Sequence, residues 1–239
     1  MSETTKKGGL FMVATPIGNL SDITLRALET LKDADVVFSE DTRVTSKLLS
    51  HFAIKKPLFR YDEHSHKQAT TKIIQLLKEG KKIALTTDAG TPGIADPGGR
   101  LVAEVSMQLP DITITPIPGV SAITTILSVS GMNTEKFTFW GYSPHKKGRK
   151  TFFENLKENK VWPVVFYESP HRIEKALNSI VDVMGGDQTI IIGRELTKLH
   201  EEVFKGCAKD AVEIFKEEGR ARGEFVVVVG NLFSSSPND

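Results

Sequence analysis

Cysteine is nearly absent from this sequence, since Cys207 is the only one among 239 residues. A single cysteine rules out an intrachain disulfide and favours a reducing compartment, for which the cytoplasm is the default. Long apolar runs are absent as well. The two longest, Leu10–Ala14 and Phe225–Val229, fall far below the roughly 20 residues that span a bilayer. We therefore expect neither a membrane segment nor a disulfide scaffold.

Two common nucleotide-binding signatures are also missing. No GxGxxG follows the first expected strand, and the basic stretch Lys146–Thr151 lacks the leading glycine of a P-loop. His64 and His66 form an isolated HxH pair without a nearby cysteine, so we expect exposed histidines there and no metal site. The net charge of +1 excludes a generally polycationic surface but allows local basic patches.

Short β-rich segments alternate with helical patterns through the first half of the chain. Five strands are expected, at residues 10–14, 35–40, 56–61, 82–88 and 112–118. Between them apolar residues recur at helical spacing, with Ser21 or Asp22 as the N-cap of the first helix. Such alternation predicts a mostly parallel sheet that is covered by helices.

A long helix, AITTILSVSGM, is expected to follow Ser121 and to lead into a second set of strands. These strands carry the sequences FTFWGY, VVFYES, TIIIGREL, EEVFKG and EFVVVVG. Another apolar stripe at helical spacing lies between residues 173 and 184. We therefore predict an α/β chain of two domains, residues 1–118 and 119–239, each with a helix-flanked, mostly parallel or mixed sheet.

The loop DAGTPGIADPG, Asp88–Gly98, is the most informative part of the sequence. Three glycines and two prolines in eleven residues make it stiffer and more open in its backbone than a βα connection of roughly 2 to 6 residues requires. Ligands of open α/β sheets bind beyond the carboxyl ends of the strands. The exposed backbone suits an adenine or a methionine moiety, and Asp88 suits ribose hydroxyls or an amino group. A rigid cap over the sheet edge is the alternative.

Three further loops at strand ends carry residues suited to a ligand. TPIGNL has Pro16, which stiffens the turn, and Gly18, which lets backbone approach a ligand closely. IPGVSA brings Ser121 to the start of a helix, where it can cap the helix and leave an N–H group facing a ligand. Ordinary connecting turns are the alternative for both. FYESPHR ends a strand with an aromatic ring, a carboxylate, a histidine and an arginine, which together suit a ligand. The alternative is that Glu168 and Arg172 pair at i, i+4 spacing.

Taken together, these loops resemble the tetrapyrrole methylase superfamily, and within it the ribosomal RNA small subunit methyltransferase I group. The motifs ATPIGNLSDIT, FSEDTRVTSKLL, TDAGTPGIADPG, PIPGVSA, FYESPHRI and GRELTKLHEE occur in family order between about Leu10 and Gly230. The resemblance implies two α/β domains with S-adenosylmethionine in the cleft between them, and a homodimer. It implies methyl transfer to the ribose 2′-oxygen of a cytidine in the decoding region, with small-subunit ribosomal RNA or the 30S particle as partner.

The resemblance also implies a set of cofactor contacts, transferred motif by motif. They are Pro16, Gly18, Asp88, Gly90, Thr91, Pro92, Ile94, Ser121, Ala122, Tyr167 and Leu196. Many relatives carry a small C-terminal extension, whereas this chain stops at Asp239 soon after the last expected strand. RNA contacts made by such an extension are therefore not expected here.

A ribose hydroxyl is a weak nucleophile, so a carboxylate is expected to accept its proton as the new bond forms. We nominate Asp41 or Glu40, in the segment SEDTR, as this base. Glu168 and Glu195 are rivals because each also ends an expected strand. The alternative role for the acidic pair is to cap the helix that begins at TRVTSKLL.

The segment YSPHKKGRK concentrates positive charge without an intervening acid. Such a segment suits contacts with RNA phosphates, and a solvated surface loop is the alternative. The candidate RNA-binding residues are Arg43, Lys146, Lys147, Arg149, Lys150 and Arg172.

Two other functions stay open at this point. A corrin-type tetrapyrrole methyltransferase would use the same kind of cleft, but it has no evident need for the basic segment. A non-catalytic ribosome-assembly factor would bind RNA beside a vestigial cleft, and the intact DAGTPGIADPG loop counts against it.

Overall fold

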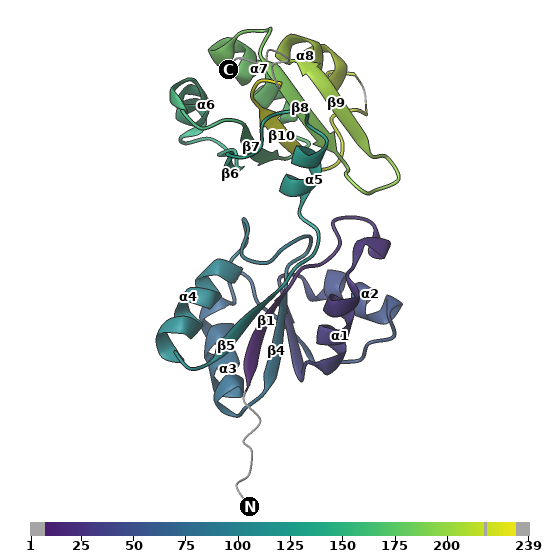
Figure 1. Cartoon of the computed structure of the whole chain (residues 1–239), viewed down its shortest axis with the longest axis vertical. Coiled ribbons are helices and arrows are strands. Elements are labelled where there is room, and N and C mark those ends of the chain that lie inside the picture. The colour runs from purple at the N-terminus through teal and green to yellow at the C-terminus, as the bar shows by residue number, and fades with distance from the viewer. Residues whose placement is uncertain (1–7, 218, 233–239) are drawn as a thin grey trace, which may run out of the picture. The chain divides into compact units, whose positions relative to one another are not determined.

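Strands and helices alternate along the chain in the computed structural model, which describes residues 8–217 and 219–232. This alternation confirms the predicted α/β class (Figure 1). The chain divides after Ser121 into two compact units, whereas the sequence placed the boundary after Pro118. Each unit is built on its own five-stranded sheet.

The first unit has a wholly parallel sheet with the strand order β3-β2-β4-β1-β5. All five strands expected in this half are present. The elements are β1 (Gly9–Val13), the short 3-10 helix η1 (Leu20–Asp22), α1 (Leu25–Asp33), β2 (Val36–Ser39), α2 (Thr42–His51), β3 (Leu58–Arg60), α3 (His66–Lys78), β4 (Lys82–Thr86), α4 (Gly98–Gln108) and β5 (Thr113–Ile117).

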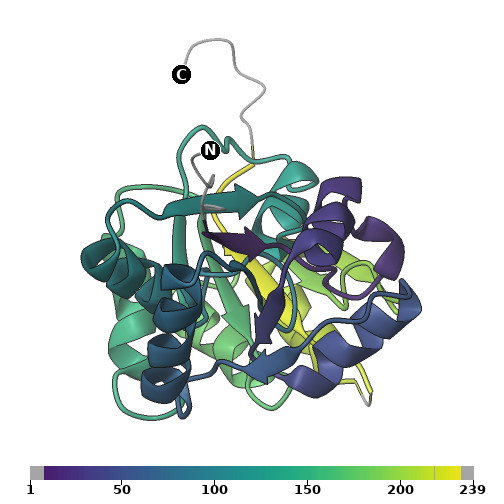
Figure 2. The same ribbon diagram turned by 90° about the horizontal axis from the view of Figure 1, so that it is seen from below.

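Helices cover both faces of this sheet, as Figures 1 and 2 show. Successive side chains of a strand point to opposite faces. On β2, Val36 and Phe38 therefore pack in the cluster that contains Ile73 of α3, while Val37 packs in the cluster that contains Leu31 of α1. Burial of each such side chain contributes about 1.5–3 kcal/mol, so both faces of the sheet hold it in place.

Two local expectations in this unit were wrong. The N-cap of α1 is Thr24, whose hydroxyl accepts from the Ala27 amide at 3.1 Å. Ser21 and Asp22 cannot serve because the preceding 3-10 turn already includes them. His66 is buried, at 4% exposure, where the sequence predicted an exposed histidine.

The second unit has a mixed sheet with the strand order β6-β7-β10-β8-β9. Only β6 and β7 pair in parallel, because β10 runs antiparallel to both its neighbours and β8 to β9. The elements are α5 (Ala122–Ser128), β6 (Thr138–Tyr142), α6 (Arg149–Glu158), β7 (Val164–Glu168), α7 (Ile173–Met184), β8 (Thr189–Arg194), β9 (Glu202–Cys207), α8 (Ala208–Phe215) and β10 (Phe225–Val229).

The three helices α6, α7 and α8 share one apolar cluster with the strands of this sheet. The short helix α5 contacts β8 and β10, where Ile126 lies so close to Gly193 that a Cβ there would be 3.0 Å from its side chain. The sequence predicted a longer helix than α5. It ends early because the Ser130 hydroxyl bonds to the Leu127 carbonyl and Gly131 turns the chain with a φ of +74°.

Within the described residues, no helix combines the length and the apolar composition that crossing a bilayer requires.

Candidate functional site

The carboxyl ends of the strands in the first unit lie at one edge, because every pairing is parallel. Hydrogen bonds join the loops that follow these strands. The backbones of Thr15 and Gly90 exchange two hydrogen bonds of 2.9 and 3.0 Å. The Thr15 hydroxyl donates to the Thr87 carbonyl at 3.2 Å, and the Thr91 hydroxyl donates to the Val120 carbonyl at 3.1 Å. The loops after β1, β4 and β5 thus form one connected surface.

The loop of residues 88–97 is held in shape from within by Asp96. Its carboxylate accepts from the Gly93 amide at 2.9 Å and from the Gly98 amide at 2.7 Å. Gly90 and Gly93 have φ values of +84° and +90°, which glycine adopts without strain. A Cβ at Gly98 would lie 2.8 Å from the Asp96 carboxylate. The glycines predicted to open the backbone are therefore required by the conformation of the loop.

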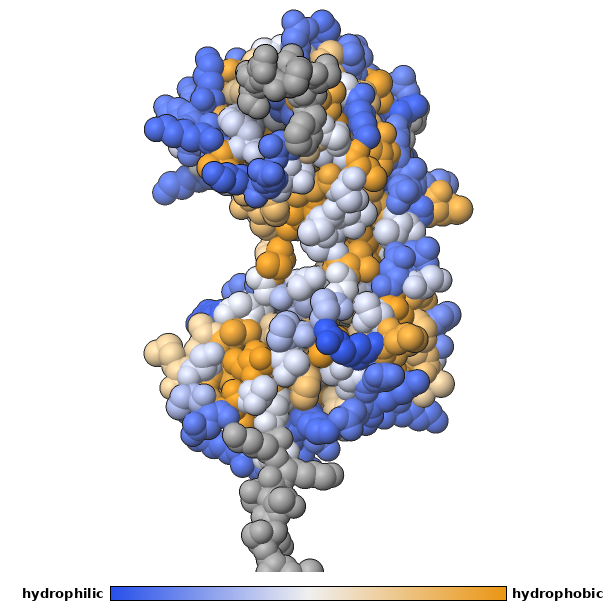
Figure 3. All heavy atoms as spheres, in the orientation of Figure 1, coloured by the Kyte–Doolittle hydropathy of each residue, from blue (hydrophilic) through white to orange (hydrophobic). Residues whose placement is uncertain are grey.

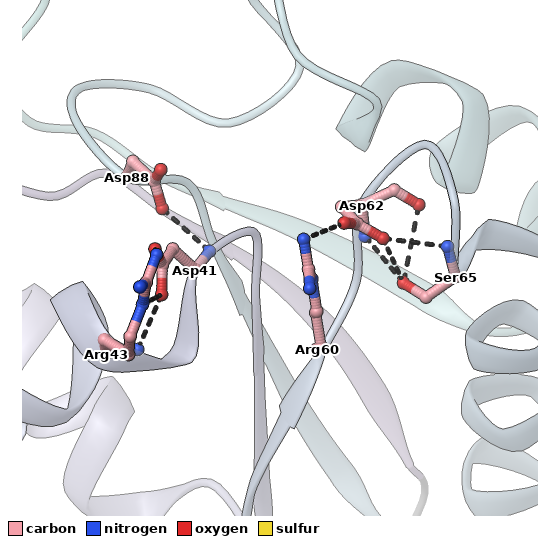
Figure 4. Close-up of polar contacts among 6 residues, drawn as sticks. All are labelled: Asp41, Arg43, Arg60, Asp62, Ser65 and Asp88. Carbon is pink, nitrogen blue, oxygen red and sulfur yellow. Dashed lines mark hydrogen bonds and ion pairs between the residues drawn. The ribbon is translucent and has the colours of Figure 1, made fainter.

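Besides Asp96, the carboxylates of Glu40, Asp41 and Asp88 lie at this edge, and Figure 4 shows those of Asp41 and Asp88. Asp88 Oδ1 accepts from the Asp41 amide at 2.8 Å, and the Thr87 hydroxyl donates to Glu40 Oε2 at 3.0 Å. Asp41 faces the Arg43 guanidinium, with Nη2 at 2.5 Å from Oδ2, and accepts from the Arg43 amide at 2.8 Å. Asp41 is thus the N-cap of α2, as the alternative interpretation of the acidic pair predicted for it.

The same three carboxylates differ in pKa. Hydrogen bonds from Arg43 lower the pKa of Asp41 to about 2. Burial raises the pKa of Glu40 against the opposing hydrogen bond from Thr87, and neighbouring aspartates raise it further. Burial also raises the pKa of Asp88, opposed by the hydrogen bond from the Asp41 amide. A carboxylate with a raised pKa is the stronger proton acceptor, so Glu40 and Asp88 are better bases than Asp41.

Most of the predicted cofactor contacts lie in the loops of this edge. Gly18 and Asp88 are exposed, Ile94 is 45% exposed, and Pro16 and Pro92 are buried beneath the loop surface. The full set in the first unit is Pro16, Gly18, Asp88, Gly90, Thr91, Pro92, Ile94 and Ser121. The edge therefore presents carboxylate, backbone and apolar groups together.

The remaining predicted contacts belong to the second unit. Ala122 begins α5. Tyr167 on β7 packs its ring against Phe139 and Tyr142 of β6, with ring centroids 5.0 and 5.3 Å apart.

Leu196, the last of these contacts, lies in a strained turn after β8. Its neighbours Glu195 and Thr197 have φ values of +50° and +69°, and such strain in residues other than glycine is common at functional sites. Glu195 accepts from Lys198 Nζ at 2.8 Å and from the Glu224 amide at 2.9 Å. Burial raises the pKa of Glu195, but these hydrogen bonds outweigh burial and lower it. Glu195 is thus engaged in holding the turn.

Glu168 lies at the end of β7 with no exposed side-chain surface. Arg149 Nη1 is 3.2 Å from Oε2, and Arg172 Nε is 2.9 Å from Oε1, which confirms the predicted i, i+4 pairing of Glu168 and Arg172. The Ser143 hydroxyl also donates to Oε2, and the Ser169 amide donates to Oε1 at 2.8 Å. The arginine side chains are only 15% and 12% exposed. This geometry favours a structural role for all three charged residues.

The other predicted RNA contacts are exposed. Lys146, Lys147 and Lys150 lie just before and within the first turn of α6, where Figure 3 shows a hydrophilic surface. No side chain caps the N-terminus of this helix. The Arg149 amide donates to the Lys146 carbonyl at 3.3 Å, so the amides of Lys150 and Thr151 are the ones available to an anion. Arg43, on α2, has a side chain 86% exposed.

Sequence reasoning missed several residues of the edge. Asp96 could have been recognised, because Asp before Pro-Gly is typical of a side chain that bonds to the backbone of its own turn. Thr87 and Arg60 carry no such signal. The contact of Thr87 with Glu40 joins two segments that are 47 residues apart in the sequence. Arg60 pairs with Asp62, two residues further along the chain (Figure 4).

Among the described residues, no group of three or more histidine, cysteine or acidic side chains is arranged to hold a metal ion.

Comparison with known proteins places this chain in a family. Residues 9–212 match the model of the tetrapyrrole (corrin/porphyrin) methylases. The Ribosomal RNA small subunit methyltransferase I of Thermotoga maritima is 45% identical over 93% of this chain and 98% of its own length. The protein of the same name from Halalkalibacterium halodurans is also 45% identical, over 98% of this chain and 80% of its own length.

Solved structures share the fold at much lower identity. A uroporphyrin-III-C-methyltransferase from Thermus thermophilus superposes with a TM-score of 0.66 at 19% identity, covering 93% of this chain and 94% of that chain. A diphthine synthase superposes with a TM-score of 0.68 at 16% identity, covering 92% of this chain and 89% of that chain. The family match and the relatives at 45% identity confirm the resemblance that the motifs showed: this chain belongs to the tetrapyrrole (corrin/porphyrin) methylase family.

Proposed function

We propose that this protein transfers a methyl group from S-adenosylmethionine to the ribose 2′-oxygen of a cytidine in the decoding region of small-subunit ribosomal RNA. The observation that carries the proposal is the single edge at which the glycine-rich loop of residues 88–97 meets the carboxylates of Glu40 and Asp88. The names of the relatives at 45% identity support the RNA substrate.

The residues of this edge fit S-adenosylmethionine, the methyl donor of this family's methyltransferases. Asp88 offers an exposed carboxylate for ribose hydroxyls or an amino group. Thr91 offers backbone groups, and Ile94 offers apolar surface, which together match the mixed character of a cofactor site. Bound there, the cofactor would supply a methyl group from a sulfonium sulfur, and this sulfur would become a neutral thioether as its bond to the methyl carbon breaks.

Glu40 is the base that we propose. Its raised pKa suits it to accept the proton of the 2′-hydroxyl while the ribose oxygen bonds to the methyl carbon. Asp41 is a weaker acceptor because Arg43 lowers its pKa. Glu168 and Glu195 are both engaged by cationic side chains. The main contribution of the protein is alignment of the reacting atoms, for which effective molarities are large.

The RNA contacts that we propose are Lys146, Lys147 and Lys150, together with the amides of Lys150 and Thr151 in the first turn of α6. Exposed lysines and a helix N-terminus both suit phosphate groups. Arg43 is a further candidate because it is exposed beside Asp41. The proposed substrate, small-subunit ribosomal RNA or the 30S particle, places the activity in the cytoplasm.

The proposed function is tested by locating a transferred label. Purified protein is incubated with labelled S-adenosylmethionine and either small ribosomal subunits or a tetrapyrrole. Label on a ribose 2′-oxygen supports the proposal, and label on a corrin carbon overturns it. RNA binding without transfer would instead favour an assembly factor. Light scattering of the same protein tests the homodimer that the family resemblance implies.

The base is tested with Glu40→Gln, which should reduce turnover about 10²- to 10⁴-fold while leaving cofactor affinity unchanged. Glu29→Gln is the matched control, because Glu29 is exposed on α1. Normal turnover by Glu40→Gln would remove Glu40 as the base.

A further inference from the structure

Tyr142 is an exposed aromatic residue that has no part in the chemistry proposed above. It is the last residue of β6, an edge strand of the second sheet (Figure 1), and it is 55% exposed. Lys146 and Lys147, two of the proposed phosphate contacts, follow it closely in the sequence and are also exposed. Single-stranded RNA binds to such combinations, because its bases stack on aromatic rings and its phosphates need cations.

An irregularity in β6 determines the direction of the Tyr142 side chain. Between the positions where Phe139 and Tyr142 pair with β7, β6 has one more residue than β7. Side chains of a regular strand alternate between the two faces of the sheet. Tyr142 would then share a face with Trp140, which packs against the apolar cluster of α6, α7 and α8. The extra residue moves Tyr142 to the opposite face, and Gly141 allows the irregularity because its φ is +66°.

The ring of Tyr142 packs against a neighbouring ring and still leaves much of its surface open. Its centroid lies 5.3 Å from that of Tyr167, with the two planes at 54°. The Tyr167 ring also lies 5.0 Å from that of Phe139, so all three rings are on one face of the sheet. Phe139 and Tyr167 are half-buried, whereas Tyr142 is exposed. A tyrosine has only two side-chain torsions, so a ring held in this way binds a flat partner at low entropic cost.

The backbone that follows Tyr142 is fixed by the two mostly buried arginines that pair with the carboxylate at the end of β7. The Ser143 carbonyl accepts from Arg172 Nη1 at 2.9 Å. The Pro144 carbonyl accepts from Arg149 Nη1 at 3.3 Å. The first of the exposed lysines comes two residues later, at most about 14 Å from the Cα atom of Tyr142. The ring and the positive charges therefore lie within reach of one short stretch of RNA.

We propose that Tyr142 binds a nucleobase of the substrate RNA: its ring stacks on a base splayed out of a single-stranded segment, while Lys146 and Lys147 contact the adjacent phosphates. The inference rests on the proposed function and adds a binding residue to it. Because the proposed methyl acceptor is a ribose oxygen, a stacked base holds the RNA without occupying the reacting atom. Stacking tolerates every base, so Tyr142 contributes affinity and position but no sequence preference.

A fluorescent RNA tests this proposal. The probe is a short oligocytidine that contains one pyrrolocytidine, whose emission changes when the analogue stacks on a ring, and it is titrated with the full chain at several salt concentrations. Tyr142→Ala should weaken the Kd about tenfold, the loss expected for one stacked base, and the emission change should disappear. Stacking releases no counterions, so the slope of log affinity against log salt should stay that of the wild type.

Two further variants separate stacking from apolar bulk. Tyr142→Phe keeps the ring and should bind RNA as the wild type does. Tyr142→Leu keeps apolar surface without a ring, so it should resemble Tyr142→Ala. The same variants are assayed for methyl transfer to small ribosomal subunits, where Tyr142→Ala should raise the KM for the subunits about tenfold while the Kd of S-adenosylmethionine stays unchanged. If the wild type does not bind the oligonucleotide, this KM decides.

Phe137→Ala is the matched control. Phe137 is 40% exposed and directly precedes β6, so it lies at the opposite end of this strand from Tyr142, about 16 Å away. Its removal should reproduce the wild type in both assays. Thermal unfolding shows which variants are folded, and Tyr142→Leu replaces Tyr142→Ala if the latter does not fold.

Wild-type RNA affinity and KM in Tyr142→Ala would overturn the inference, while methyl transfer by the wild type would still support the proposed function. A loss of cofactor affinity would also overturn it, because the ring would then belong to the cofactor site. A changed mass in light scattering would overturn it as well and assign the ring to a contact between copies of this chain. If the wild type placed no label on ribose, the proposed function would fail, and the inference with it.

Discussion

Replacement of Glu168 by glutamine should destabilise the second unit. The substitution keeps the size of the side chain but removes the negative charge that Arg149 and Arg172 share. An amide can still accept from the Ser169 amide, as Glu168 Oε1 does at 2.8 Å. It cannot neutralise two guanidinium groups that are 15% and 12% exposed. The variant would therefore leave two positive charges together in a mostly buried place.

The size of the effect follows from this burial. Removing one partner of a buried ion pair costs about 3–5 kcal/mol, because the charge left behind is uncompensated. The matched control is Glu154→Gln, on α6, whose carboxylate lies 3.6 Å from Lys150 Nζ in a pair that is 50% and 89% exposed. Exposed pairs of this spacing contribute only about 0.3–0.5 kcal/mol.

Urea unfolding followed by tryptophan fluorescence measures both variants. Both tryptophans of the chain, Trp140 and Trp162, pack against the apolar cluster of the second unit, so the signal reports on that unit. The midpoint of Glu168→Gln should fall well below those of the wild type and the control. If its midpoint stayed unchanged while turnover collapsed at normal cofactor affinity, Glu168 would be the base, and the proposal for Glu40 would be wrong.

Three further predictions concern the surface and the loops. Changing Lys146, Lys147 and Lys150 together to glutamine should reduce the slope of log affinity for RNA against log salt by about 2, at about 0.7 for each single-strand phosphate contact; an unchanged slope in filter binding would remove these lysines from the RNA model. Gly98→Ala should lower stability by about 1–3 kcal/mol, measured by thermal unfolding, because its Cβ would lie 2.8 Å from a carboxylate oxygen; wild-type stability would show that the loop can shift. The Asp41 carboxyl should titrate near about 2 in an NMR pH series. Its stabilising contribution is then present above its ordinary pKa of 3.8 and lost as the pH falls through about 2, and a midpoint at 3.8 would contradict the pairing with Arg43.

The fold could be predicted from the sequence because its signals are local. Alternating strands and helices, and the strongly apolar β1 and β10, follow from periodicity and composition within short windows. The two element boundaries that were predicted wrongly involved short-range competition. The 3-10 turn at Leu20–Asp22 displaced the predicted N-cap of α1, and the turn at Ser130 and Gly131 shortened α5.

The site could be predicted only as far as its loops are motifs. The loop of residues 88–97 can be recognised in the sequence by its glycine and proline content. Its position beyond β4 follows from the parallel sheet. Side-chain partners across the fold could not be predicted in this way. Arg149 was grouped with exposed lysines because its sequence neighbours are basic, yet in the structure it meets Glu168, which lies on a different element. His66 was expected at the surface because the HxH pair has no cysteine nearby. In the structure it is buried against Tyr61 and against Glu104 of α4, which is 38 residues away in the sequence.

The paired backbone hydrogen bonds between Thr15 and Gly90 have a consequence for how the loop of residues 88–97 behaves before any ligand binds. They extend the hydrogen-bonding of the sheet into the loop, so the loop becomes ordered when the first unit folds. Its conformational entropy is then lost during folding and not again on association, which favours a preorganised site. In hydrogen exchange, the amide protons of Thr15 and Gly90 should resemble those of the central strands in their protection, with or without a bound ligand.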